Sequence, residues 1–491
     1  MRELYLGLDC GTQSTKAMLI DAGGQVFGTG QAPHSLIERE SGAREQQPQW
    51  WIDAAISAIR EAMRTAREKG ECAVLAIGVS GQQHGLVVLD EQYDVIRAAK
   101  LWNDTETAPQ NAEIVARMGG ATEYERRFGI TPLTGYTVSK LLWLQQKEPE
   151  HFARMRHVML PHDYLNWWLT GRICAEPGDA SGTGYFDVRR RIWAREVLDA
   201  IDTRLYAYLP QLIASDEIAG TLRLEVAELL GLSKECVVSS GGGDNMMGAI
   251  GTGNVQPGVV TMSLGTSSTL YTYRESAFAS VPAGVAPFCS SSSNTGWLPL
   301  LCTMNATNVV NSMLGTLGLG LDSFDRLLNE SEPGASGITV LPFLNGERTP
   351  DLPHARGSVS SVSAVNLSAA NLFRATVEGI TFGVLQGLDA LLDGATASRI
   401  LLIGGGAKSA SWRQMVADAS GLQVEVPLVE EAGCLGAAIQ AMAAYTGRSI
   451  AQIAETCVRI DTAKTAMPQK PGLYVAAMER YRERLKMEYG A

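Results

Sequence analysis

Two carboxylates stand beside glycines at the ends of short β-like runs. Asp9 follows the apolar run Leu4–Leu8 and precedes a Gly-Thr turn, whereas Asp244 follows three consecutive glycines and precedes a short helical stretch. Because Mg²⁺ keeps most of its water in protein sites, Asp9 is a candidate to hold it through water. Asp244 is a candidate to accept a hydroxyl proton, orient the hydroxyl oxygen and help bind the metal. The alternative for Asp244 is a helix N-cap.

Two Gly-Thr turns could bind phosphate groups. Gly11-Thr12-Gln13 separates the first two β-like runs, and Gly265-Thr266 occupies the same place between the runs Val259–Leu264 and Thr269–Tyr273. A glycine lets the backbone approach an anion, and successive N–H groups and hydroxyls can then surround the phosphate oxygens. The alternative for both segments is an ordinary hairpin turn.

A third glycine-rich loop could form part of a nucleotide pocket. Gly404-Gly405-Gly406 follows the apolar run Arg399–Ile403, and Ser409 then precedes the helical stretch Trp412–Ser420. The start of a helix offers free N–H groups to a polar ligand. The loop is not a Walker A motif, because no GxxxxGK[ST] sequence occurs in the chain. A simple turn is the alternative here.

Two polar pairs follow strands in the first half of the chain. Gln83-His84 and Asn103-Asp104 offer the donors and acceptors that the hydroxyls of a polyol need. A single histidine is more often a structural residue than a ligand contact, so a purely structural role is the alternative for His84. Trp50-Trp51 could stack on a sugar, but their place at a helix start favours the core.

Short strands and long helices must position these residues. The runs Leu4–Leu8, Lys16–Asp21 and Gln25–Gly28 predict strands joined by hairpins. A helix is expected to begin at Pro48 and end at Gly70, because apolar residues recur between them at steps of three and four. The strand Ala73–Val79 follows it. Helices are also expected over residues 372–392 and 473–489. This mixture is typical of an α/β architecture.

The order of strand, Gly-Thr turn and strand occurs twice. Residues 259–273 repeat the pattern of residues 6–19, and a boundary near residue 250 would divide the chain into nearly equal halves. This repetition predicts a duplicated core. A chain of 491 residues is also too long for one ordinary core.

The charge and apolar patterns exclude several classes of partner. A net charge of −11 argues against nucleic acid or an anionic membrane as partner. No apolar run approaches the roughly 18 residues of a membrane span, and the N-terminal residues do not resemble a signal peptide. The eight cysteines form no CxxC pair, so we expect reduced thiols, no zinc site and a cytoplasmic location.

Taken together, these stretches resemble the FGGY family of carbohydrate kinases, and most closely those members that act on D-xylulose. The resemblance runs from residue 4 to about residue 485, in the family's order. It is carried by LGLDCGTQSTKAML, EQQPQWWIDAA, SGQQHG, LWND, SKLLWL, LPHDYLNWWLTG, GGGDN, SLGTSS, LPFLNGERTP and LIGGGAKSASWRQMVAD.

The resemblance implies two ribonuclease-H-like domains of the actin and hexokinase type, residues 1–248 and 249–491, with a cleft between them. It implies transfer of a phosphoryl group from ATP to a sugar, with Asp244 as base and Asp9 supporting Mg²⁺. The implied ligand contacts are Gly11, Thr12, Gln13, Gly265 and Thr266 for the ATP phosphates, Gly405, Gly406 and Ser409 for adenine, and Gln83, His84, Asn103, Asp104 and Asn245 for the sugar. A homodimer is common among relatives.

Three positions depart from the family pattern. Glu106 stands where many relatives have Arg, and Gln83 stands where they have Met. Both changes are expected near the sugar pocket, so ribulose, gluconate, glycerol or another polyol stays open as the substrate. Ser361 replaces a usual Gly and is expected to be structural. A non-catalytic, nucleotide-binding sugar sensor is the alternative from another class.

Overall fold

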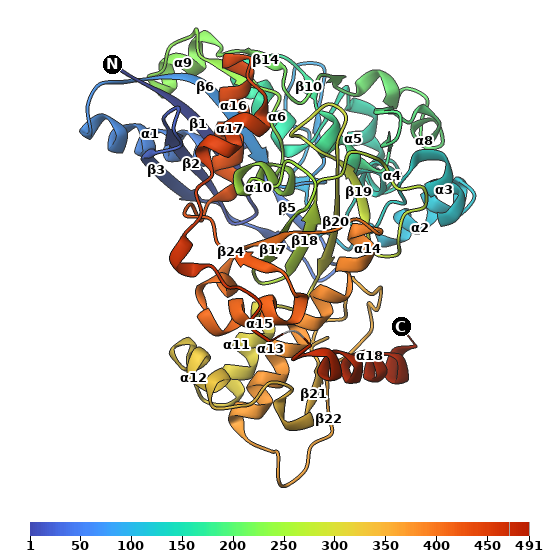
Figure 1. The fold of residues 1–491 in the computed structure, drawn as a ribbon. Coiled ribbons are helices and arrows are strands. Elements are labelled where there is room, and N and C mark those ends of the chain that lie inside the picture. Colours follow the sequence, from blue (N-terminus) through green and yellow to red (C-terminus); the bar gives the residue numbers. More distant parts are fainter. Residues whose placement is uncertain (471, 491) are drawn as a thin grey trace.

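The computed structural model describes residues 1–470 and 472–490 and contains two central β-sheets (Figure 1). The first sheet and its helices form the blue-to-green part of the molecule, and the second sheet with its helices forms the yellow-to-orange part. Among the described residues, no helix is both long and apolar enough to cross a membrane.

The first sheet is built on the N-terminal hairpins. β1 pairs with β2 antiparallel and with β6 parallel, and the strand order is β14-β15-β6-β1-β2-β3, with β16 pairing the far end of β6. The predicted hairpins are confirmed. The strands are β1 (Arg2–Cys10), β2 (Ser14–Ile20), β3 (Val26–Pro33), β6 (Cys72–Gly81), β14 (Ile218–Thr221), β15 (Val237–Ser239) and β16 (Gly242–Gly243).

The second sheet repeats this arrangement. Its order is β19-β20-β18-β17-β23-β24, and β17 pairs antiparallel with β18 and parallel with β23, as β1 does with β2 and β6. The predicted duplicated core is therefore confirmed at the level of topology. The strands are β17 (Val259–Leu264), β18 (Ser268–Thr272), β19 (Ala286–Cys289), β20 (Trp297–Thr303), β23 (Arg399–Ile403) and β24 (Gln423–Glu425).

A long insertion between β6 and β15 has its own hydrophobic cluster, which includes Ile114, Tyr124, Leu141 and Leu198. It carries the polar pair at residues 103–104 and several aromatic residues. Its principal helices are α2 (Ala108–Arg117), α3 (Ala121–Phe128), α4 (Thr137–Lys147), α5 (Pro149–Arg154), α6 (Pro161–Thr170), α7 (Pro177–Ala180), α8 (Arg195–Asp199) and α9 (Leu224–Leu230).

The helices that flank the sheets were mostly predictable. α1 (Pro48–Glu68) begins at the expected proline and buries one face against the first sheet. The helix expected over residues 372–392 is in fact two, α13 (Ala369–Gln386) and α14 (Leu388–Leu392). They meet at Gly387, where a Cβ would overlap the Leu301 side chain of β20. The remaining helices include α10 (Asp244–Thr252), α11 (Thr307–Thr316), α12 (Phe324–Asn329), α15 (Ala410–Ser420), α17 (Ile450–Cys457) and α18 (Val475–Tyr489).

One helix of the second half returns to the first sheet. α16 (Ala432–Thr446) shares a core cluster with residues of β1, β2 and β6 and with α10, and Figure 1 shows it in red beside the blue strands. Glycines allow this close approach. A Cβ at Gly7 would overlap the carbonyl oxygen of Cys434, and one at Gly436 would overlap that of Met247. The proposed boundary at residue 248 lies inside α10, which packs against α16.

We predict that Gly436→Ala destabilises the protein, because the new methyl group must displace the α10 backbone. The expected loss is about 1–3 kcal/mol of unfolding free energy, measured as a lower Tm by scanning calorimetry. Gly315→Ala is the matched control, since Gly315 lies exposed in α11 with no atom near its missing Cβ. That change should stabilise slightly. Equal Tm values for the two variants would contradict the close packing of α16.

Candidate active site

A cavity of about 400 Å³ lies between the two halves of the chain. It gathers six predicted site residues: Gln83, His84, Asp244, Asn245, Gly265 and Thr266. Residues of both halves complete its walls, among them Trp102, Leu133, Tyr136, Ser263, Ser267, Phe288, Leu300, Cys302 and Arg348. The other predicted residues do not line it: Asp9, Gly11, Thr12, Gln13, Asn103, Asp104, Gly405, Gly406 and Ser409.

The two candidate carboxylates lie at the same end of the first sheet. Asp9 pairs with Ser80 of β6, and the Ser80 hydroxyl donates to its Oδ1 over 2.6 Å. Gly242 pairs with the same Ser80 through β16, which places Asp244 two residues beyond. The N-cap of α10 is Gly243 and Asp244 is the first helical residue, so the N-cap alternative for Asp244 is wrong.

Both carboxyl groups have pKa values above their ordinary range. Burial raises the pKa of Asp9. Burial, followed by the negative charges of Asp9 and Asp179, raises the pKa of Asp244 to about 7. The Asp244 carboxylate accepts hydrogen bonds from its neighbour Asn245, from the backbone N over 2.9 Å and from Nδ2 over 3.1 Å. A group with this pKa is suited to exchange protons near neutral pH.

The residues around Asp9 fit a hydrated Mg²⁺. The described residues contain no group of three or more His, Cys, Asp or Glu side chains that could hold a metal alone. Mg²⁺ does not require such a cage, because it is usually held by one or two carboxylates, water and substrate phosphates. A cation beside Asp9 would favour the ionised forms of two carboxylates whose pKa values are raised by burial and, for Asp244, by the charge of Asp9. Lys16, on the adjacent strand, is paired with Glu431 over 2.6 Å.

The first Gly-Thr turn is tied to the cavity wall. The Thr12 hydroxyl accepts from Trp102 Nε1 over 3.0 Å and donates to Gln82 Oε1 over 3.2 Å. Gln46 donates to the Thr12 carbonyl over 2.7 Å and accepts from the indole of Trp51. Trp51 is fully buried, which supports its assignment to the core.

The second Gly-Thr turn is fixed by the start of α11. The carbonyl of Gly265 accepts from Thr307 Oγ1 over 2.7 Å and from Thr307 N over 3.0 Å. β17 and β23 run parallel, with Ser263 opposite Ile403, so the loop at residues 404–406 lies beside this turn. Gly404 has a φ of 85° and packs against the backbone of Leu264.

Ser409 has a structural role at the start of α15. Its hydroxyl accepts from Trp412 N over 3.0 Å as a helix cap and donates to Asp325 Oδ1 over 2.6 Å. Gly405 begins a short 3-10 helix (Gly405–Lys408) and is exposed, whereas Gly406 is buried. The adenine contacts expected at these positions stay predictions.

The cavity wall formed by the first half carries connected polar groups. Asn245 Nδ2 donates to Gln83 Oε1 over 3.0 Å, and Gln83 Nε2 is buried without a hydrogen-bond partner among the described residues. The His84 Nδ1 lies 2.7 Å from the carbonyl of Gly182. Burial, followed by the positive charge of Lys140, lowers the pKa of His84 to about 3. A neutral ring that donates from Nδ1 leaves Nε2 as an acceptor.

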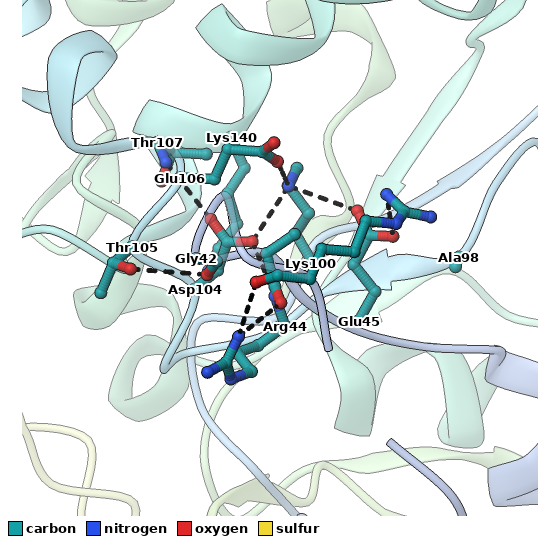
Figure 2. Close-up of polar contacts among 12 residues, drawn as sticks. Gly42, Arg44, Glu45, Ala98, Lys100, Asp104, Thr105, Glu106, Thr107 and Lys140 are labelled. Atoms are coloured by element: carbon teal, nitrogen blue, oxygen red, sulfur yellow. Dashed lines mark hydrogen bonds and ion pairs between the residues drawn. The ribbon is translucent and has the colours of Figure 1, made fainter. Parts of the chain in front are cut away.

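Asp104 belongs to a buried ion-pair network. Figure 2 shows the Lys100 ammonium between the carboxylates of Glu45, Asp104 and Glu106, at 3.3, 3.0 and 2.5 Å. Lys100 is fully buried, and Asp104 also accepts from the backbone of Arg44 over 3.1 Å. Asp104 therefore holds the loop that carries Trp102.

Glu106 does not line the cavity, contrary to the expectation from the sequence. Its carboxylate points to Lys100 (Figure 2), which explains why an acidic residue is tolerated at this position. Burial raises the pKa of Glu106, but the hydrogen bonds from Lys100 and Ser41 and the charges of Lys100 and Arg39 together hold that pKa below its ordinary range. Asn103 also lies outside the lining, although its Oδ1 is buried without a partner among the described residues.

Sequence reasoning missed several residues that line the cavity. Trp102, Tyr136 and Arg348 stand inside the quoted stretches or beside them, but no local pattern shows that they share a wall.

Ser361, expected to be structural, has a φ of 61°. That conformation favours glycine, which accounts for the usual residue there.

The comparisons with known proteins cover the whole chain. The N-terminal domain of the FGGY family of carbohydrate kinases matches residues 4–251, and the C-terminal domain matches residues 260–445. A xylulose kinase of Haemophilus influenzae is 45% identical over 99% of this chain and 100% of its own.

Solved structures agree with these matches. A xyloylose kinase from Brucella ovis is 32% identical, with a TM-score of 0.92 over 99% of both chains. A xylulose kinase from Bifidobacterium adolescentis is 30% identical, with a TM-score of 0.81 over 98% of this chain and 99% of its own. The expected two-domain fold of the actin and hexokinase type is thereby confirmed.

We predict that Glu106→Arg destabilises the protein without changing which sugar it prefers. Lys100 would lose one carboxylate and gain a second cation beside it, at a cost of about 1–3 kcal/mol. Calorimetry measures the loss, and relative kcat/KM values for several sugars measure the preference. Lys408→Met is the control, because the Lys408–Glu430 pair is exposed and should contribute little. A changed sugar preference at unchanged Tm would show that Glu106 acts on the substrate.

Proposed function

Because the chain belongs to the FGGY family of carbohydrate kinases, we propose that it transfers the γ-phosphoryl group of ATP to the terminal hydroxyl of D-xylulose. The names of its relatives support the choice of sugar. The observation that carries the proposal is a cavity that places Asp244 and the polar residues beside it opposite the Gly265-Thr266 turn of the second half. Such a cavity can hold a small polyol and the end of a triphosphate together.

Asp244 is the proposed base. Its carboxylate accepts the proton of the sugar hydroxyl while that oxygen attacks the γ-phosphorus, and ADP leaves with the electrons of the broken P–O bond. The elevated pKa makes Asp244 a better proton acceptor than an exposed aspartate, while leaving it largely ionised above neutral pH. Asn245 fixes the orientation of the carboxylate through its backbone N and Nδ2.

The proposed phosphate contacts come from both halves. Gly11, Thr12 and Gln13 would face the phosphates from the first sheet, and Gly265 and Thr266 from the second. Asp9 and Asp244 would hold Mg²⁺ through water, and the ion would neutralise charge on the phosphate oxygens. Gly405, Gly406 and Ser409 would lie along the adenine.

The proposed sugar contacts are Gln83, His84 and Asn245. Gln83 Nε2 can donate, and the neutral ring of His84 can accept at Nε2. Asn103 stays a candidate because its buried Oδ1 has no partner among the described residues. Asp104 would act mainly by holding the Trp102 loop. A cytoplasmic location is part of the proposal, and a homodimer stays a prediction.

A panel of sugars tests the proposed function. In a coupled assay of ADP release, D-xylulose should give the highest kcat/KM among D-xylulose, ribulose, gluconate and glycerol. A higher kcat/KM for another member of the panel would reassign the substrate, and Gln83→Met would then be the first variant to measure, because Gln83 lines the cavity. Sugar binding without ADP release would instead favour a non-catalytic sensor.

Asp244→Ala should remove the base and leave the nucleotide site. We expect kcat to fall by about 10²–10⁴-fold, with ATP affinity changed by only a few fold. Asp322→Ala is the control, because Asp322 is an exposed aspartate at the start of a short helical turn. If Asp244→Ala retained near wild-type turnover, Asp244 would not be the base.

A further inference from the structure

An arginine of the second half lines the cavity without a carboxylate partner. Arg348 is half-buried in the loop that contains the stretch LPFLNGERTP, to which no role has been assigned above. Within residues 1–470 and 472–490, its guanidinium forms no ion pair. Cavity walls that carry an unpaired cation are suited to a ligand that supplies acceptor oxygens.

The loop around Arg348 is rigidly held. The adjacent Glu347 is buried, and its carboxylate accepts from Met304 N over 2.6 Å and from Asn305 Nδ2 over 3.0 Å. Asn305 also donates to the carbonyl of Gly346 over 2.7 Å. The Glu347 carboxylate also accepts from Arg348 N over 2.8 Å, so it is bound by backbone and amide donors and forms no ion pair with the Arg348 guanidinium among the described residues. The loop presents Arg348 to the cavity in a preorganised way.

Arg348 faces the His84 end of the opposite wall. Burial and then the charge of Lys140 lower the pKa of His84, and Arg348 adds to this effect. Burial raises the pKa of Tyr136, and Arg348 opposes that rise. The rings of His84 and Tyr136 are stacked 4.5 Å apart, so the guanidinium lies near both.

The groups of this wall have a fixed order. Asp244 contacts Asn245, Asn245 contacts Gln83, and His84 follows Gln83 in the chain. The side chains of Asp244, Asn245 and Gln83 thus form one hydrogen-bonded series, and His84 lines the same cavity. An open-chain sugar whose terminal hydroxyl is at Asp244 would extend its other end toward His84 and Arg348.

Resting on the function proposed above, we propose that Arg348 is a sugar-binding residue supplied by the second domain, and that its guanidinium donates hydrogen bonds to the carbonyl end of the ketose. An arginine can only donate. A ketone oxygen can only accept a hydrogen bond, so it fits the guanidinium. A sugar hydroxyl between Arg348 and His84 would accept from Arg348 and donate to His84 Nε2. The sugar would bridge the two domains in this arrangement, which ties sugar binding to closure of the cleft.

The other role open to an arginine here is contact with the transferred phosphoryl group. We favour the sugar, because Arg348 lines the cavity together with His84 and Tyr136, and its charge affects the pKa values of both. The two roles differ in the kinetic constant that they change.

The test is steady-state kinetics of Arg348→Ala in the full-length protein, with D-xylulose and ATP varied separately. Loss of a charge-assisted hydrogen bond should raise KM for the sugar by about 10- to 100-fold, with KM for ATP within about 3-fold of wild type. Arg348→Lys keeps the positive charge but not the planar guanidinium group. Its KM for the sugar should therefore lie between those of the wild type and Arg348→Ala. Calorimetric titration of D-xylulose without nucleotide should show the same order of affinities.

Arg356→Ala is the matched control, because it removes an exposed arginine eight positions along the same segment. It should leave both KM values unchanged. A second experiment compares D-xylulose with 1-deoxy-D-xylulose, which lacks the hydroxyl next to the ketone. The wild-type protein should bind the deoxy sugar more weakly than D-xylulose. The Arg348→Ala variant should show a smaller difference between the two sugars, because it has already lost its contact with the carbonyl end.

Two results would overturn the inference: an unchanged KM for the sugar in Arg348→Ala, or a rise confined to KM for ATP with a lower kcat. If Arg348→Ala does not fold, as judged by its Tm, the same KM values are measured for Arg348→Lys, and the same two results would overturn the inference. If the wild-type protein phosphorylates no ketopentose, the proposed function fails. If it does and Arg348→Ala keeps its affinity for the sugar, only the role of Arg348 fails.

Discussion

Two half-buried carboxylates at one end of the first sheet are the constraint on which the site depends. Burial raises the pKa values of both Asp9 and Asp244, and the negative charge of Asp9 adds to the rise for Asp244. The hydrogen bonds that they receive are few: Ser80 donates to Asp9, and Asn245 donates to Asp244. In the proposed function, a cation and the sugar hydroxyl would lie beside these carboxylates and offset the cost of burying their charges. The arrangement is unfavourable for stability and suited to phosphoryl transfer.

The second half of the chain completes this setting by returning to the first sheet. Gly433, at the start of α16, lies so close to Asp9 that a Cβ would stand 2.9 Å from its carboxylate. Glu431, just before that helix, pairs with Lys16 beside Asp9. Glycines at positions 7, 78 and 436 let the helix approach the sheet and α10. The two halves are therefore joined at the carboxylates as well as across the cavity.

The sequence was sufficient for features that repeat along the chain. Strand alternation, helix spacing and glycine turns predicted β1, α1 and the second hairpin, because these follow from local patterns. It could not separate α13 from α14, since the break at Gly387 serves contact with Leu301 in a distant strand. Nor could it show that α16 belongs beside the first sheet.

Side-chain direction was the other limit. Asp104 and Glu106 follow a strand in the right region, but both carboxylates contact the ammonium of Lys100 (Figure 2) and neither lines the cavity. Arg348 was missed because no local pattern shows that its loop reaches the cavity. Both outcomes depend on contacts between residues far apart in the chain.

The proton affinity of Asp244 can be measured by ¹³C NMR of protein labelled at the aspartate carboxyl groups. The Asp244→Asn spectrum assigns the carboxyl resonance. We expect a titration midpoint near the pKa of about 7 in the free protein, and a shift to lower pH when Mg²⁺ and nucleotide are added. A midpoint near the ordinary value of about 3.9 in the free protein, unmoved by Mg²⁺ and nucleotide, would contradict it.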